Sequence, residues 1–175
     1  MSGKYAIEYF EFYEEILNEL QGMLENVTNG SVEHEPQVVS RSIEELDRCS
    51  DFSEILDVVK ITVKETLGET RPDIALGFQN LPLQVGAYHP VGSNWIVMNQ
   101  RLLDAACNHL SSQREMNSFI FSIMLHEYLH ALGYLNEYQV RQLVYEISRR
   151  TLGEVHPATR IARVGPWEAL LNSVN

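Results

Sequence analysis

The chain is poor in cysteine, in basic residues and in long apolar runs, and each shortage excludes a class of protein. Cys49 and Cys107 are the two cysteines among 175 residues, too few for a disulfide-stabilised scaffold and typical of reduced thiols in a cytoplasmic protein. Lysine and arginine number 13 against 24 aspartate and glutamate residues, for a net charge of -11. This balance argues against nonspecific binding to nucleic acids or to anionic membranes.

The hydrophobic residues are spread along the chain rather than gathered into one segment. No run of about 18 or more apolar residues exists, so no transmembrane helix is predicted. The first residues lack a basic region followed by an apolar run, and no secretory signal peptide is expected. A hydrophobic content of 45% is sufficient for a buried core, and 175 residues favour one domain with a helical appendage. We therefore expect a cytoplasmic protein that neither spans nor binds a membrane.

Residues 126–130 read His-Glu-Tyr-Leu-His, an HExxH sequence. On an α-helix, residues four apart share one face, so His126 and His130 can direct two imidazole rings at a single point. Glu127 lies one step around the helix, where its carboxylate can hold a metal-bound water rather than the metal. This pattern is typical of a zinc site that activates water for hydrolysis.

The residues around the motif predict a buried helix. Ser112 and Glu115 form a capping box at its start, and the residues that follow are apolar on most sides. Gly133 fits the end of the helix, where a positive φ lets the chain turn back. A buried polar cluster is unfavourable without partners, and a metal ion would supply them. The alternative is a pair of hydrogen-bonded core histidines with Glu127 as their partner.

Residues 1–68 are predicted to be mostly helical and carry no recognisable chemistry. Apolar residues recur every three or four positions between Tyr9 and Val27, which predicts a helix that packs on its own domain or contacts a second copy of the chain. Two capping-box pairs predict two further helices: Ser42 with Glu45, and Asp51 with Glu54.

Short strands are predicted after Arg71, over residues 74–78, 83–88 and 95–98, followed by a helix that begins at Asn99. We therefore divide the chain into a helical N-terminal segment, residues 1–68, which packs on or covers the core, and a core, residues 69–175. The predicted fold class is α+β, with a small mixed sheet packed on the HExxH helix.

Beyond the second histidine the sequence continues to Gly133, Asn136 and Glu137, which extends the motif to HExxHxxGxxNE. This pattern resembles the extended motif of zincin metallopeptidases. It is similar to the metzincin sequence HExxHxxGxxH, in which the residue three after the glycine is the third zinc ligand. It is more similar to small bacterial and archaeal zincin-like proteins that read HExxHxxGxxDE.

The resemblance covers residues 71–150. It includes residues 88–90 and 95–99, which look like the zincin sheet and its substrate-lining edge strand. The resemblance implies a zincin-like core over residues 69–175, a bound Zn²⁺ and the hydrolysis of peptide bonds.

The identity of the third metal ligand stays open in the sequence. The metzincin position falls on Asn136, and an amide is a poor zinc ligand beside a carboxylate. Glu137 is our first candidate because it is adjacent and anionic. Its alternative role is structural, because Asn136 is a plausible N-cap with Gln139 at the third helical position, and a glutamate in the first turn suits the helix dipole.

His156 and Glu146, which lie later in the chain, are further candidates for the third ligand. His156 is the second, and its alternative role is a helix N-cap or a surface residue before Pro157. Glu146 is the third, and its alternative role is a surface ion pair with Arg149 and Arg150 at helical spacing.

These features predict a zinc-dependent metallopeptidase in which Glu127 is the general base. Tyr134, Tyr138 and His89 are candidates to stabilise the oxyanion, and His89 is also a candidate ligand. Residues 95–98 are expected to pair with an extended peptide. The alternative is a noncatalytic zinc-binding, regulatory or interaction domain with a zincin fold, and iron or nickel could replace zinc on the same imidazoles. The expected partners are a peptide or protein substrate and no nucleic acid, with a homo-oligomer through the N-terminal helix as a further hypothesis.

Overall fold

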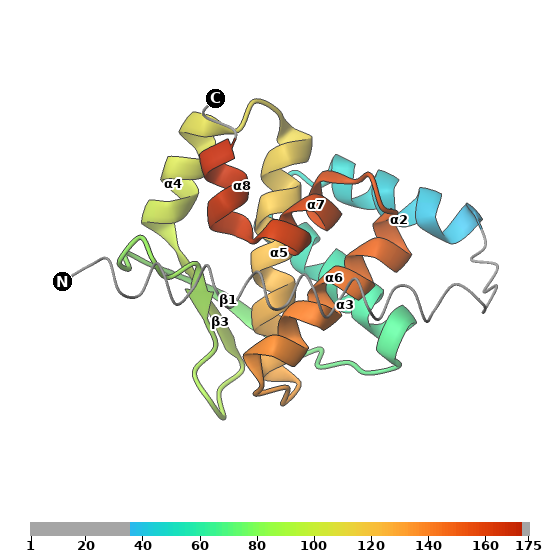
Figure 1. Cartoon of the computed structure of the whole chain (residues 1–175). Helices are drawn as coiled ribbons and strands as arrows, with labels where there is room; N and C mark the ends of the chain where they lie inside the picture. The colour runs from blue at the N-terminus through green and yellow to red at the C-terminus, as the bar shows by residue number, and fades with distance from the viewer. Residues whose placement is uncertain (1–35, 173–175) are drawn as a thin grey trace. The chain divides into compact units, whose positions relative to one another are not determined.

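The computed structural model describes residues 36–172, all of which belong to one compact unit (Figure 1). In chain order its elements are α2 (Pro36–Arg48), α3 (Phe52–Leu67), β1 (Ala75–Gln79), β2 (Ala87–Tyr88), β3 (Trp95–Asn99), α4 (Gln100–His109), α5 (Gln113–Ala131), α6 (Glu137–Leu152), α7 (Pro157–Val164) and α8 (Pro166–Asn172). Seven helices and a small three-stranded sheet make this part of the chain mixed α+β, which confirms the predicted fold class at this level. The helix expected between Tyr9 and Val27, with its hypothetical role in oligomerisation, lies outside the described residues.

Helix α5 lies at the centre of the hydrophobic core. It packs against helices on several sides and against β2 and β3 (Figure 1). Its start confirms the predicted capping box, because Ser112 Oγ accepts the backbone N–H of Glu115 at 3.2 Å. The Glu115 carboxylate in turn accepts the backbone N–H of Ser111 at 2.9 Å. Between Asn117 and Ala131 every residue of α5 is buried except His126 and His130, which are partly exposed.

The three strands form a sheet in the order β1-β3-β2, with β1 parallel and β2 antiparallel to β3. Ile96 and Met98 of β3 are fully buried and direct one face of the sheet into the core, whereas Trp95 on the other face is 46% exposed. The predicted strand over residues 95–98 is confirmed, but its prediction as an edge strand is wrong. β3 pairs on both sides, because the chain places β1 and β2 on opposite sides of it.

The strand predicted over residues 83–88 is wrong except for its last two residues, which form β2. The buried side chain of Asn99 holds the preceding segment in a loop. Its Oδ1 accepts the backbone N–H of Leu81 at 3.0 Å, and its Nδ2 donates to the carbonyls of Pro82 and Val85 at 3.0 and 2.7 Å. Because backbone groups of this loop are bonded to one side chain, they do not pair with a strand.

Helices α2 and α3 begin differently, and only one of the predicted starts is correct. Asp51 caps α3 by accepting the backbone N–H groups of Ser53 and Glu54 at 2.8 and 2.9 Å, as predicted. The start predicted at Ser42 is wrong, because α2 begins at Pro36 and Ser42 lies buried inside it. A proline suits the first helical position, where its missing N–H would have no partner.

Both N-terminal helices of the described part pack on α5 and α6, and they belong to the same compact unit as residues 69–172. α3 ends at Gly68, which adopts a φ of +74°. The linker from Gly68 to Asp73 then leads to β1. None of the described helices is long and apolar enough to cross a membrane.

Candidate metal centre

The two histidines of the HExxH sequence face each other on the exposed side of α5. Their Nε2 atoms lie 3.1 Å apart, and their rings stand at 71° with the centroids 4.8 Å apart. His126 and His130 are separated by four residues, so the helix alone places them on one face. Their side chains are 25% and 17% exposed, which leaves each ring open on one edge.

A tight turn after α5 brings the chain back toward these rings. The N–H of Tyr134 donates to the carbonyl of Leu129 at 3.1 Å, and the N–H of Gly133 donates to the carbonyl of His130 at 3.0 Å. This pair of bonds is a Schellman motif, which requires a residue in a left-handed conformation. Gly133 provides it with a φ of +102°.

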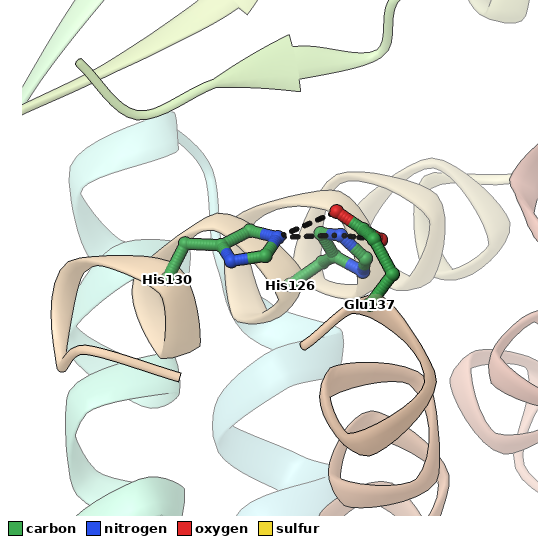
Figure 2. Close-up of side chains that lie close together, drawn as sticks. All are labelled: His126, His130 and Glu137. Atoms are coloured by element: carbon green, nitrogen blue, oxygen red, sulfur yellow. Dashed lines mark hydrogen bonds and ion pairs between the residues drawn. The ribbon is translucent and has the colours of Figure 1, made fainter. Parts of the chain in front are cut away.

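The turn delivers Glu137 to the two histidines. Asn136 accepts the backbone N–H of Gln139 at 2.9 Å and caps α6, so Glu137 occupies the first turn of that helix. Figure 2 shows the Glu137 carboxylate close to both rings. Its Oε1 lies 3.1 Å from His130 Nε2, and its Oε2 lies 3.3 Å from His126 Nε2. The ligand atoms of these three residues all lie within 4.8 Å of one another.

The protonation of His130 is fixed by the turn. Its Nδ1 lies 2.7 Å from the carbonyl oxygen of Tyr134, which can only accept, so Nδ1 carries the proton. In a neutral imidazole the other nitrogen is then unprotonated, and Nε2 presents a lone pair to the centre of the group. Burial lowers the pKa of His126 to about 4 against the raising influence of the Glu137 carboxylate, with smaller lowering contributions from His130 and Arg141, so the His126 ring is neutral at pH 7.

Two imidazole lone pairs and one carboxylate therefore converge on a common point. The two Nε2 atoms lie 3.1 Å apart, close to the edge of a tetrahedron of zinc ligands, which is about 3.3 Å for metal–ligand bonds of about 2.0–2.1 Å. Each Nε2 faces a different oxygen of the Glu137 carboxylate, at 3.1 and 3.3 Å. Glu137 is 63% exposed, so the group is open to solvent on its outer side. The donor set fits a divalent cation with room for a further ligand.

Glu127 lies beside this group but not in it. Its residue is 9% exposed, and its carboxylate is hydrogen-bonded to the backbone N–H of His89, at the end of β2. Burial raises the pKa of Glu127 to about 7, against the lowering influence of His130 and of the His89 bond, while Glu137 raises it further. A carboxylate with this pKa can both accept and release a proton near neutrality.

The other two candidate ligands lie elsewhere. Glu146 pairs with Arg149 at 3.0 Å and with Arg150 at 2.5 Å, the alternative role considered for it. Burial raises the pKa of the Glu146 carboxyl, but its hydrogen bonds to the two arginines outweigh burial and lower it overall.

His156 caps α7, where its Nδ1 accepts the backbone N–H of Ala158 at 3.2 Å. Its side chain is fully buried, and its Nε2 lies 3.5 Å from Asp47 Oδ1, beyond hydrogen-bonding geometry. Burial lowers the pKa of His156, and the nearby Arg114 lowers it further. The structure therefore places His156 against α2 and gives it the capping role considered as an alternative.

The three candidates for oxyanion stabilisation have partners of their own. The Tyr134 hydroxyl donates to Glu69 at 2.5 Å, and this bond raises the pKa of the phenol. The Tyr138 hydroxyl accepts from Gln142 at 2.7 Å. His89 Nδ1 lies 2.8 Å from the carbonyl oxygen of Trp95.

Two supporting residues of the site were not anticipated from the sequence. Glu69 contacts Tyr134, and the Arg71 guanidinium donates to the carbonyls of Ala131 and Ser93 at 2.6 and 2.7 Å. Both lie on the Gly68–Asp73 linker, where Glu69 precedes Tyr134 by 65 residues and Arg71 precedes Ala131 by 60. In the sequence, Gly68 and Pro72 indicate a linker, but they do not indicate which residues the linker contacts.

Comparisons of the chain with protein-family models, with curated proteins and with solved structures found no match. A function for this site is therefore argued from its own residues.

Proposed function

We propose that this chain is a zinc-dependent peptidase, in which His126, His130 and Glu137 bind the metal and Glu127 is the general base. The observation that carries the proposal is the convergence of two imidazoles and a carboxylate at 3.1 to 3.3 Å, next to a buried glutamate. The packing of α5 against β2 and β3 is consistent with a zincin-like core, which we assign to residues 69–175.

The residues divide the work of hydrolysis between them. A bound Zn²⁺ would supply a Lewis acid and lower the pKa of a bound water to about 7. Glu127, with its pKa near 7, takes a proton and passes one to the leaving amine. The backbone N–H of His89 holds the Glu127 carboxylate in place during this transfer.

We assign substrate binding to β2 rather than to β3. Within the described part of the chain, β2 pairs with β3 on one side only, and it lies against α5. His89, directly after β2, contacts Glu127 through its backbone N–H. An extended peptide that adds to the outer edge of β2 would therefore run past the general base.

A noncatalytic zinc site is the competing function. Structural zinc sites use four protein ligands, whereas catalytic sites use three and leave one position open. Among the described residues the group contains three ligands, and Glu137 is 63% exposed. A structural site would also have no use for a buried carboxylate beside the first histidine.

Metal analysis of the purified full-length chain is the first test. We expect about one zinc per chain, lost in His130→Ala and in Glu137→Ala and retained in Glu127→Gln. His109→Ala and Glu146→Gln are matched controls outside the group, and both should retain the metal. Iron instead of zinc would contradict a zinc peptidase and favour an iron enzyme, because two histidines and one carboxylate also bind iron in oxygenases. Absence of any metal after supplementation would contradict the proposal.

Activity is tested next, with a fluorogenic library of mixed peptides. The native chain should cleave part of the library, and Glu127→Gln should lower the rate at least about 100-fold while the metal content stays unchanged. A Glu127→Gln variant that keeps both metal and activity would remove Glu127 from the mechanism. Full metal occupancy without cleavage of any peptide would favour the noncatalytic function.

A further inference from the structure

We propose that Glu69 is a positioning residue that acts through Tyr134 to orient His130 for metal binding, an inference that rests on the proposed metal site. Glu69 lies on the Gly68–Asp73 linker, outside the HExxH segment. Its carboxylate accepts the hydroxyl of Tyr134 at 2.5 Å. The carbonyl of the same tyrosine accepts the Nδ1 proton of His130 at 2.7 Å.

The two bonds act on opposite ends of one residue. The phenol of Tyr134 is anchored to the linker, and its backbone carbonyl is bonded to the ligand. Anchoring the side chain restricts the conformations of residue 134, and this restriction fixes where its carbonyl oxygen lies. The direction of the carbonyl sets both the tautomer and the rotation of the His130 ring.

The surroundings make such an anchor useful. The turn after α5 carries Leu135, which is 73% exposed, and Asn136 and Glu137 are exposed as well. The start of the turn is held by the Schellman bonds of Gly133 and Tyr134 to α5, and its end is held by Asn136, which caps α6. The bond to Glu69 is a third restraint, and it joins the turn to a separate part of the chain.

Arg71 holds the neighbouring part of the same helix end. Its guanidinium bonds to the carbonyl of Ala131 and to that of Ser93, so it ties the end of α5 to the loop before β3. The linker thus contacts α5 through Arg71 and the turn through Glu69. Arg71 fixes the position of the helix end, whereas Glu69 acts on the residue that bonds to the metal ligand.

The test measures metal affinity on the full-length chain. Zn²⁺ is titrated into the metal-free native protein, into Tyr134→Phe and into Glu69→Gln, in competition with a chelating dye. Loss of a residue that bonds directly to a metal ligand weakens metal binding about 10- to 100-fold. The Glu69–Tyr134 hydrogen bond is one hydrogen bond further from the metal. We therefore expect each variant to bind Zn²⁺ roughly three- to tenfold more weakly. The double variant should bind no more weakly than the weaker single variant, because all three lack the same hydrogen bond.

Tyr145 and Glu154 provide a matched control. They form the same kind of exposed hydrogen bond at 3.1 Å, away from the three candidate ligands. Tyr145→Phe and Glu154→Gln should therefore leave the zinc affinity unchanged. A second readout is the visible absorption of the Co²⁺-loaded protein, which reports ligand geometry and should change in Tyr134→Phe but not in Tyr145→Phe.

The outcomes separate this inference from the proposed function. A native chain that binds no Zn²⁺ or Co²⁺ overturns both. If the native chain binds metal and both Tyr134→Phe and Glu69→Gln bind it as tightly as the native chain, only the role of Glu69 is overturned. Additive losses in the double variant also overturn it, because they show that the two residues act separately.

Discussion

The hydroxyl of Tyr128 accepts the backbone N–H of Arg71 at 2.7 Å and donates to the carbonyl of the same residue at 3.3 Å. Tyr128 is fully buried in the middle of the HExxH sequence, so this pair of bonds joins the HExxH segment to the Gly68–Asp73 linker. One face of α5 carries His126 and His130, whereas Tyr128 of the same helix binds the linker.

Tyr128→Phe removes this hydroxyl without changing the packing of the ring. The Arg71 N–H then loses its partner in a partly buried position, and we expect a loss of about 1–2 kcal/mol in the free energy of unfolding. Urea unfolding in the presence of a chelator measures it. Tyr88→Phe is the control, since its exposed hydroxyl bonds to Gln79 and its loss should change stability by less than about 0.5 kcal/mol. Equal stabilities of the two variants would show that the Arg71 bond contributes nothing.

Gly133→Ala tests the turn that delivers Glu137. A Cβ at this position meets no atom within 4 Å, so the substitution acts only through the positive φ of +102°. We expect a destabilisation of about 1–2 kcal/mol and weaker metal binding. Thermal unfolding and zinc titration measure the two effects. Gly77→Ala in β1 is the control, because its Cβ would lie at an ordinary 3.5 Å from Trp95, and both properties should be retained. A Gly133→Ala variant as stable as Gly77→Ala would contradict the strained turn.

Zinc should stabilise the folded chain by mass action. At a free zinc concentration of 100 times Kd, the expected gain is about 2.7 kcal/mol over the chelator-treated protein. Denaturant unfolding with and without zinc measures this gain. It should vanish in His130→Ala and persist in His109→Ala, whose histidine lies exposed at the end of α4. A zinc-dependent gain of the same size in His130→Ala would place the metal elsewhere.

The buried His156 predicts a dependence of stability on pH in the metal-free protein. Its pKa is lowered in the folded state by burial and by Arg114, with Arg160 acting in the same direction and Asp47 opposing them. Below an unfolded pKa of about 6.5 the unfolded chain binds a proton that the folded chain does not. The contribution of His156 is therefore complete above about pH 6.5 and is lost as the pH falls.

His156→Asn isolates this contribution, because asparagine keeps an N-cap acceptor and does not titrate. Other groups also titrate in this range, and the raised pKa of Glu127 gives a contribution of opposite sign, which falls as the pH rises from about 4.5 to 7. The measurement is therefore the difference in unfolding free energy between native and variant protein at pH 5 and pH 8. Native protein should lose more stability on acidification, and parallel pH profiles would exclude His156 as the cause.

Local patterns accounted for most of what the sequence could predict. The capping pairs at Ser112 and Asp51, the helix end at Gly133 and the strand over residues 95–98 depend on neighbours within a few positions. Glu137 was also proposed from the local sequence, because it is anionic and directly follows Asn136, the position of the metzincin ligand. These features require no knowledge of tertiary contacts.

Apart from the start of α2, which was predicted at Ser42, the failures involve partners that are distant in the sequence. The strand predicted over residues 83–88 was too long, because the bonds that hold its first part in a loop come from Asn99, 14 to 18 residues away. His156 was kept as a ligand candidate because the residue it packs against, Asp47, lies 109 positions earlier in the sequence. The place of β3 in the middle of the sheet depends on which strands pair with it, and alternation of residues does not specify pairing.

The three candidate ligands all come from the continuous segment 126–137, whereas the residues that restrain this segment are 57 to 65 positions away. Bringing the ligands together needs only one short loop to close, which is a fast and inexpensive event for a chain that is still folding. The contacts of the linker have a high sequence separation, because they join residues 57 to 65 positions apart. The proposed ligands are thus local to one helix–turn–helix segment, whereas the restraints on their geometry depend on the rest of the fold.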